Sequence, residues 1–178
     1  MEKLSSFKAY DVRGKVPTEL NEDLAYKIGR AYTKLINCKE VVIGFDVRKS
    51  SVSISEALIK GFTDSGVDVI NIGLCGTEMI YFATSYLKVD GGIMITASHN
   101  PPEYNGMKFV KRDSVPVSYD SGLNEIEKII LSEDFLPVSE SKGKVVNKDI
   151  SDDFIKNLEK FYDVSKIKQL KVVVNAGI

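Results

Sequence analysis

The chain has 178 residues, 43% of them hydrophobic and 28% charged, which is an ordinary globular composition with enough apolar mass for one core and part of a second. Its 24 Lys and Arg nearly balance its 25 Asp and Glu, and no run of five like charges occurs, so neither nucleic acid nor a membrane surface is an expected partner. The apolar runs are too short to span a bilayer, and the N-terminus lacks the apolar stretch of a signal peptide. We therefore expect a cytoplasmic protein whose partners are small molecules or other proteins.

The two cysteines, Cys38 and Cys75, lie in different segments without Cys-x-x-Cys spacing. This spacing argues against a disulfide framework and against a zinc site, so we expect reduced, half-buried thiols. A nucleophilic pair of Cys75 with the sole histidine, His99, stays open, because a sequence gives no distances.

Apolar residues at helical spacing predict a first helix over 21–36, with Asn21 as its N-cap. A second helix is predicted over 53–66, opened by a Ser53-x-x-Glu56 capping box and closed by Gly66. The other predicted elements are strands at 41–46, 67–73, 91–96 and 107–111 and helices at 77–86 and 121–131. The alternation of strands and helices indicates an α/β layered domain.

After about Ser132 the sequence becomes polar and is typical of a connector. A helix is then predicted over 151–162 and an apolar strand over 171–178. A parallel-type strand normally feeds a crossover helix, so we expect the strand to begin a second domain. The predicted division is 1–135 for the first domain, 136–150 for the connector and 151–178 for the start of the second.

The segment 96–108, TASHNPPEYNGMK, follows a predicted strand directly. Ligands bind beyond the carboxyl ends of strands in α/β sheets, and two prolines stiffen this loop, so Ser98, His99 and Asn100 are candidate site residues. Each also has a structural interpretation without catalysis, since loop serines form turns and lone histidines are mostly surface residues. Asn105-Gly106 is read as a two-residue hairpin turn, and Lys108 would by default be a solvated lysine at a sheet edge.

Two further polar clusters stand out. In FKAYDVRGK, Tyr10, Asp11 and Arg13 precede a glycine, and Arg13 offers a planar fork suited to phosphate, although a simple salt bridge is the alternative. In GFDVRKSS, we favour a structural role, in which Asp46 and Arg48 brace a loop through charge-assisted hydrogen bonds.

In their order and spacing, FKAYDVRGK, GFDVRKSS and TASHNPPEYNGMK resemble the α-D-phosphohexomutase superfamily, over essentially the whole chain. NEDLAYKIGRAY, GTEMIYFA and VDGGIMITASHNPPEYNGMK are most similar to its bacterial phosphomannomutase branch. The resemblance implies a three-layer α/β/α first domain with a mixed four-stranded sheet, followed by further C-terminal domains. The aspartate-rich metal loop, the sugar-specificity loop and the phosphate-clamping loop of the family would lie after Ile178, so we expect this chain alone to be inactive.

The resemblance also implies the roles of individual residues. Ser98 matches the serine that is phosphorylated in the active form and whose phosphate oxygen binds Mg²⁺. It implies that Tyr10, Arg13, Asn100 and Lys108 surround the phosphate or the substrate. Arg13, His99 and Lys108 are candidates for charge stabilisation or proton transfer, and the sequence does not assign the acid or the base.

The implied activity of the whole protein is the interconversion of mannose 6-phosphate and mannose 1-phosphate through a hexose bisphosphate. A phosphoglucomutase of the same superfamily stays open as an alternative, because sugar choice is made in a domain that would follow residue 178. A non-catalytic module that binds phosphosugars is a further alternative.

Overall fold

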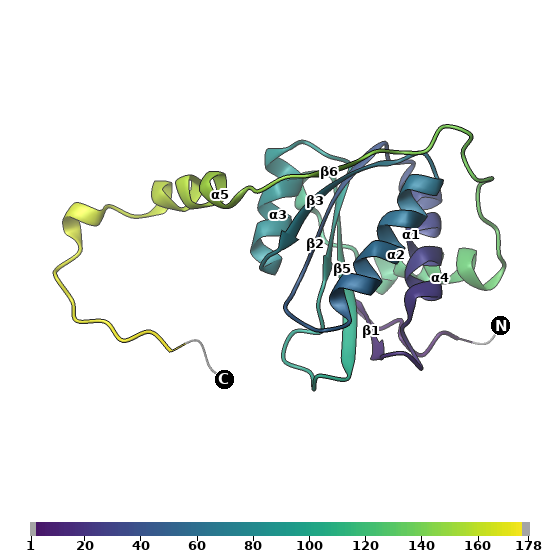
Figure 1. Ribbon diagram of the computed structural model, residues 1–178, viewed down its shortest axis with the longest axis horizontal. Coiled ribbons are helices and arrows are strands. Elements are labelled where there is room, and N and C mark those ends of the chain that lie inside the picture. The colour runs from purple at the N-terminus through teal and green to yellow at the C-terminus, as the bar shows by residue number, and fades with distance from the viewer. Residues whose placement is uncertain (1–2, 176–178) are drawn as a thin grey trace.

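A computed structural model describes residues 3–175, and these form a three-layer domain with a sheet between two sets of helices (Figure 1). The strands are β1 Val12–Lys15, β2 Glu40–Phe45, β3 Asp68–Leu74, β4 Gly91–Ile95, β5 Tyr104–Lys111 and β6 Val145–Asn147. The helices are α1 Glu22–Ile36, α2 Ser51–Asp64, α3 Thr77–Tyr86, α4 Asn124–Leu131 and α5 Ser151–Leu158. The α/β fold class and all four predicted strands are thereby confirmed.

The sheet is mixed, as expected, but has six strands in the order β1-β5-β4-β2-β3-β6 instead of four. Strand β2 pairs in parallel with β3 and β4, and β6 pairs in parallel with β3, whereas β5 is antiparallel to both β4 and β1. The two extra strands, β1 and β6, are the edges of the sheet. These edge strands have only four and three residues, so no long apolar run marked them in the sequence.

Helices α1, α2 and α4 cover one face of the sheet and α3 covers the other. One cluster of buried apolar side chains lies on each face. Tyr32 of α1 is fully buried, with its ring 5.7 Å from that of Phe62 and 6.0 Å from that of Phe109. Its hydroxyl donates to the Val110 carbonyl at 2.8 Å, which satisfies the buried polar group. Burial raises the pKa of Tyr32, so this hydroxyl stays a donor.

Of the two predicted N-terminal caps, that of α1 is confirmed and that of α2 is wrong. Asn21 caps α1, and its side chain accepts from the Leu24 N–H at 2.9 Å. Helix α2, in contrast, begins at Ser51, which places Ser53 inside the helix. The Ser53 hydroxyl donates at 2.7 Å to the Glu22 carboxylate of α1, so it joins two helices instead of opening one.

The predicted turn at Asn105-Gly106 is also wrong, because both residues lie inside β5. Gly106 lies opposite Arg13 of β1, and its own carbonyl accepts from the Thr96 N–H at 2.9 Å. A Cβ at Gly106 would stand 2.4 Å from the Val12 carbonyl oxygen and 2.8 Å from that of Thr96. The glycine is therefore required by close packing of three neighbouring backbones, and the chain reverses earlier, over 97–103.

After β6 the chain leaves the body (Figure 1). Ile150 is buried and the Phe154 ring lies 5.5 Å from that of Phe82, so the start of α5 packs against α3. The strand predicted over 171–178 does not form over 171–175, where no other strand is present to pair with it, and 176–178 lie outside the described residues. The predicted domain boundaries at 135 and 150 stay predictions. No helix within residues 3–175 combines the length and apolarity needed to cross a membrane.

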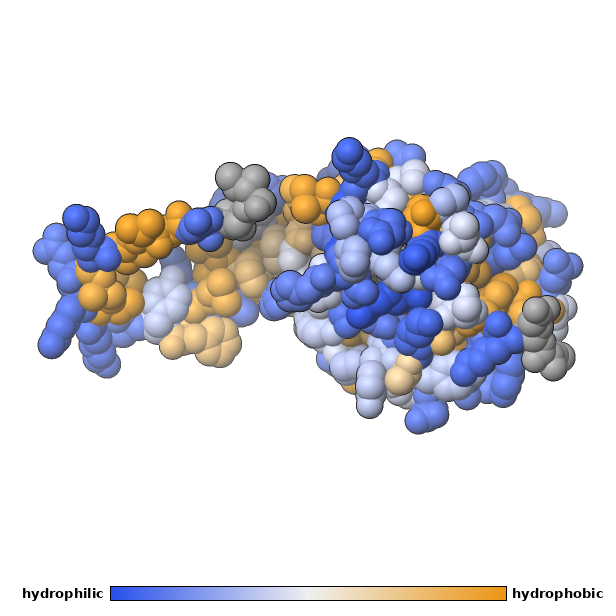
Figure 2. Space-filling view, turned by 90° about the horizontal axis from the view of Figure 1, so that it is seen from below, coloured by the Kyte–Doolittle hydropathy of each residue, from blue (hydrophilic) through white to orange (hydrophobic). Residues whose placement is uncertain are grey.

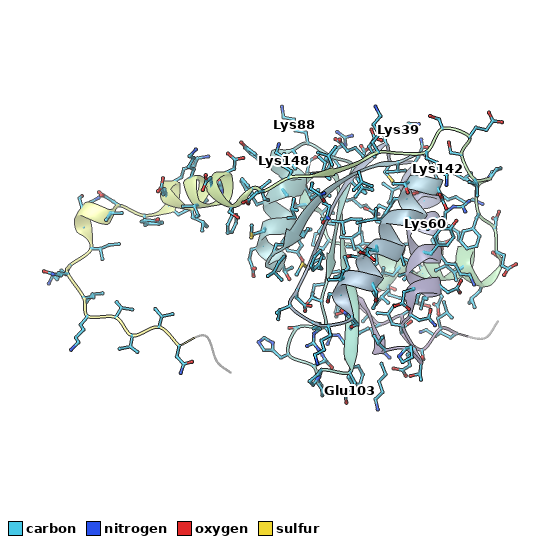
Figure 3. The ribbon with its side chains drawn as sticks, viewed as in Figure 1. Lys39, Lys60, Lys88, Glu103, Lys142 and Lys148 are labelled. Atoms are coloured by element: carbon cyan, nitrogen blue, oxygen red, sulfur yellow. The ribbon has the colours of Figure 1, made fainter. Side chains whose placement is uncertain are left out.

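The segment that leads to β6 is fastened to α2 through Asp64, which is 5% exposed. Lys60 and Lys142 both pair with this carboxylate, and the Tyr26 hydroxyl donates to it at 3.1 Å (Figure 3). The hydrogen bond from Lys60, and next that from Lys142, lower the pKa of Asp64 to about 2. Donors to the charged form stabilise it, so the ion pair between Lys142 and the ionised Asp64 side chain adds to the attachment of this segment to α2.

The fold makes a first prediction at Gly106. Replacement Gly106→Ala should lower the free energy of unfolding by about 2 kcal/mol or more, because the new methyl group meets two backbone carbonyls that cannot move independently. Urea unfolding monitored by circular dichroism measures the loss. The control is Gly76→Ala, where the nearest atom is the flexible end of the Glu78 side chain. Equal stability of the two variants would contradict the close packing.

A second prediction concerns acid stability. A carboxylate whose folded pKa is lowered stabilises the fold above its unfolded pKa and loses that contribution as the pH falls through the folded value. Wild type should therefore be more stable than Asp64→Asn at pH 7, and the difference should vanish as the pH falls from 3.8 towards 2. Urea unfolding across this range measures it, with the exposed Asp120→Asn as control. A difference that does not change with pH would contradict the assignment.

Candidate functional site

The loop 96–103 follows β4 at the carboxyl end of the parallel strands, and Ser98 and His99 are exposed on it. Ser98 adopts φ 54°, a left-handed conformation that non-glycine residues adopt rarely and at an energetic cost. The Ser98 N–H donates to the Thr96 hydroxyl at 2.9 Å, and the Asn100 backbone and side-chain N–H groups both donate to the Ala97 carbonyl. Local hydrogen bonds on both sides thus hold the strained serine.

The Ser98 hydroxyl has a base beside it. Its Oγ lies 3.0 Å from His99 Nδ1, within hydrogen-bond distance. When Nδ1 carries no proton, the imidazole can accept the hydroxyl proton, which is the arrangement of an activated nucleophile. The structure therefore brings together two of the predicted site residues.

Arg13 and Lys108 meet at a shared carboxylate. Arg13 forms an ion pair with Asp11, and the Lys108 ammonium lies 3.6 Å from the same Asp11 oxygen. Asp11 is the least exposed of the three side chains, at 10%, against 30% for each cation. The salt bridge that was the alternative interpretation of this cluster is thus present, and it holds two cations on one anion.

Strand register places these cations next to the Ser98 loop. Arg13 lies opposite Gly106 of β5, and on the other side of Gly106 lies Thr96, the first residue of the loop. Two strand spacings separate the Thr96 and Arg13 backbones by roughly 10 Å. Residues directly opposite each other, and residues two apart on a strand, point to the same face, so Arg13, Lys108 and Thr96 share one face of the sheet. No side chain at Gly106 stands between them.

The other two predicted site residues lie differently. Tyr10 is 77% exposed, at the turn that precedes β1, and borders a hollow with Lys8 and Tyr119. Asn100 uses its side-chain N–H within the loop, on Ala97. Their predicted contacts with phosphate or substrate stay predictions.

The buried side chains of Asn105 and Ser51, which the sequence did not mark as site residues, support the loop. Asn105 is fully buried, and its amide donates to the hydroxyls of Ser50 and Ser51, at 2.9 and 3.0 Å. The Ser51 hydroxyl in turn donates to Asp46 at 2.7 Å. The expected bracing role of Asp46 and Arg48 is confirmed, because Arg48 pairs with Asp46 and donates to loop carbonyls. An Asn directly before Gly was read as a turn, which hid the role of Asn105.

Cys75 does not form the alternative nucleophile. Its sulfur lies 3.8 Å from the Met94 sulfur, and burial raises the pKa of the thiol to about 11. The thiol is therefore protonated near neutral pH and is a poor nucleophile. Cys38 is buried and also free.

The surface around the loop is polar. Figure 2 views the molecule from the loop side and shows mostly hydrophilic residues there, interrupted by small apolar patches. Glu103 lies at the tip of this side in Figure 3, and its carbonyl accepts from the Val16 N–H at 2.8 Å. Residues 3–175 contain no group of three His, Cys, Asp or Glu arranged to hold a metal ion.

The network beneath the loop predicts the effect of removing Asn105. Replacement Asn105→Ala should lower the free energy of unfolding by about 2 kcal/mol, because the buried Ser51 hydroxyl and the partly buried Ser50 hydroxyl lose a hydrogen-bond donor. Denaturant unfolding measures it. The control is Asn147→Ala, which removes one exposed hydrogen bond with Asn71 at the β6 edge and should change stability by less than about 0.5 kcal/mol. A larger loss at Asn147 than at Asn105 would contradict this network.

Comparison with known proteins agrees with this geometry. Residues 4–137 match the domain described as phosphoglucomutase/phosphomannomutase, alpha/beta/alpha domain I. A phosphomannomutase of Escherichia coli K12 is 48% identical over 178 residues, which is 99% of this chain and 39% of the relative. A phosphomannomutase of Klebsiella pneumoniae is 51% identical over 142 residues, covering 80% of this chain and 90% of the relative.

Among solved structures, a phosphoglucomutase/phosphomannomutase family protein from Burkholderia thailandensis superposes with a TM-score of 0.81 at 33% identity. The match covers 96% of this chain and 38% of that protein. The chain therefore belongs to the phosphoglucomutase/phosphomannomutase family of the α-D-phosphohexomutase superfamily.

Proposed function

We propose that this chain carries the phosphoserine of a phosphomannomutase that interconverts mannose 6-phosphate and mannose 1-phosphate. The chain spans 39% of the length of its Escherichia coli relative, so the proposed activity is that of the full-length protein and residues 1–178 alone are expected to be inactive. The observation that carries the proposal is the exposed Ser98 hydroxyl, which lies 3.0 Å from His99 Nδ1 on a residue with a left-handed φ, in a loop that starts on the same face of the sheet as Arg13 and Lys108.

The proposed reaction moves a phosphoryl group between oxygen atoms, and protons move with it. A hydroxyl of the hexose monophosphate attacks the phosphorus on Ser98, the bond to Ser98 Oγ breaks, and a hexose bisphosphate forms. The sugar hydroxyl gives its proton to a base, and Oγ takes up a proton. In the second half Oγ gives up its proton and attacks the other phosphate of the bisphosphate. The bond between that phosphorus and its sugar oxygen breaks, the sugar oxygen takes up a proton, and the other hexose monophosphate leaves. His99, at hydrogen-bond distance from Oγ, is placed to exchange the serine proton.

The cations suit the charge that this reaction moves. A phosphoserine carries a charge of about −1.5 to −2, and phosphoryl transfer depends mainly on positioning and on neutralising such charge. Arg13 and Lys108 share a face of the sheet with the start of the Ser98 loop and are both about one-third exposed. We assign them to the phosphate oxygens, with Tyr10 and Asn100 as further phosphate or substrate contacts.

We propose Mg²⁺ as the cofactor, bound by an oxygen of phosphorylated Ser98. Phosphate oxygens are hard ligands of the kind that Mg²⁺ prefers, and the ion would supply further positive charge at the transferred group. Asp11 and Asp46 are both occupied by ion pairs with arginine. Within residues 3–175, only the phosphate on Ser98 would therefore be available to bind Mg²⁺. Carboxylate ligands would come from the rest of the full-length protein.

Glucose phosphates are the second candidate substrate. The matched domain is described for phosphoglucomutases as well as phosphomannomutases, and the Ser98 loop contacts the phosphate, which both sugars share. The names of the relatives favour mannose. A comparison of kcat/KM for mannose 1-phosphate and glucose 1-phosphate separates the two.

The proposal predicts that Ser98→Ala in the full-length protein lowers kcat by about 1,000-fold or more, because no hydroxyl remains to carry the phosphate. A coupled assay with mannose 1-phosphate measures turnover, and phosphopeptide mass spectrometry of the wild type should find phosphate on Ser98. Ser85→Ala, an exposed serine on α3, is the control and should keep wild-type turnover. Retained turnover in Ser98→Ala, or an active wild type without phosphate on Ser98, would refute the proposal.

A further inference from the structure

The Ser98 loop is wrapped around the guanidinium group of Arg48. One terminal nitrogen donates to the carbonyls of Ser98 and Asn100, at 2.8 and 2.6 Å. The other donates to the carbonyls of Pro101 and Tyr104, at 2.8 and 3.0 Å. Four carbonyls from a span of seven residues thus converge on one planar group.

Arg48 is itself held in place from β2. Its Nε lies 3.3 Å from the Asp46 carboxylate, which also accepts from the Arg48 N–H and the Ser51 hydroxyl. The Arg48 side chain is only 11% exposed. Asp46 is anchored in turn, because its N–H donates to the Ile95 carbonyl at the end of β4.

This arrangement leaves the guanidinium no free donor. An arginine side chain has five N–H groups, and here four donate to carbonyls while the fifth faces Asp46. Arg48 therefore cannot also bind a phosphate oxygen without releasing the loop. In this it differs from Arg13, whose Nε is buried without a hydrogen-bond partner among the described residues, and from the partly exposed Lys108.

Arg48 fixes the backbone on one side of the serine and Thr96 fixes it on the other. The Ser98 carbonyl is bound by Arg48, and the Ser98 N–H is bound by the Thr96 hydroxyl. Since each peptide group is planar, both peptides that flank Ser98 are held, and the hydroxyl position then varies through χ1 alone. The strained φ of 54° at Ser98 is maintained by these contacts.

We infer that Arg48 is a positioning residue for phosphoryl transfer, which acts through the backbone of the loop and does not contact the phosphate. The inference rests on the proposed function. It assigns to Asp46 the task of orienting the guanidinium plane. It also requires arginine specifically, because lysine has three donors around one nitrogen and cannot reach four carbonyls with a planar fork.

The test is Arg48→Lys in the full-length protein, assayed with mannose 1-phosphate. We expect kcat to fall about 100-fold with KM unchanged, since misplacing a reacting group affects the transition state and not substrate binding. Hydrogen exchange should become faster at the Asn100 and Tyr104 amides, which donate to carbonyls of the loop. Exchange of the amides in β2 and β4 should stay unchanged. In Arg48→Ala, added guanidinium ion should restore part of the lost kcat.

The matched control is Arg112→Lys. Arg112 is 61% exposed and pairs with Asp90 near the other end of the sheet, so this variant should keep wild-type kcat and loop exchange. If Arg48→Ala does not fold, Arg48→Lys alone tests the inference, because this variant keeps the positive charge and most of the side-chain packing. Wild-type kcat in Arg48→Lys, a loss confined to KM, or equally accelerated exchange throughout the sheet would overturn the inference.

Parallel assays separate this inference from the proposed function. If Ser98→Ala is inactive while Arg48→Lys has wild-type kcat and loop exchange, the positioning role fails and the proposed function stands. If Ser98→Ala keeps its turnover, the proposed function fails, and with it the role assigned to Arg48.

Discussion

The reversal of the chain between β4 and β5 is the constraint on which the site depends. Strand β4 runs parallel to β2 and antiparallel to β5, so the chain must turn back at the edge where the parallel strands end. Strand β5 then pairs with β1 and brings Arg13 to this edge. The approach is possible because Gly106 has no side chain to meet the Val12 and Thr96 carbonyls. A residue near the N-terminus and a loop some 85 positions later thereby share one site.

The sequence predicted the elements that bury one periodic face. Helix α1, with its Asn21 cap, and helix α3 were found because burial leaves apolar residues at regular spacing. Strands β1 and β6 lie at the edges and have only four and three residues, so they left no such pattern. Asn105-Gly106 was misread because its local turn preference is overridden by tertiary contacts, namely the bonds from Asn105 to Ser50 and Ser51. Local propensity cannot report such contacts.

The site was predictable only in part, for a related reason. Ser98 and His99 are neighbours in sequence, and Asp46 and Arg48 were expected to brace a loop, so these short-range relations could be derived. The partners of Arg48 could not be derived, because every residue carries the same backbone carbonyl and the identity of the acceptor leaves no trace in the sequence. The shared carboxylate of Arg13 and Lys108 depends on strand register, which also becomes visible only in the folded chain.

The charges around the Ser98 loop fall into two groups with different consequences. Arg48 and Asp46 neutralise each other, and the remaining donors of Arg48 are taken by backbone carbonyls, so this pair shapes the loop without adding net charge. Arg13 and Lys108 share Asp11, so two positive charges and one negative charge leave a net charge of +1. On the proposed function, a phosphate on Ser98 would bring about −1.5 to −2. Arg13, Lys108 and Asp11 together would then balance only part of that charge, which leaves a role for the proposed Mg²⁺ and for other cationic groups.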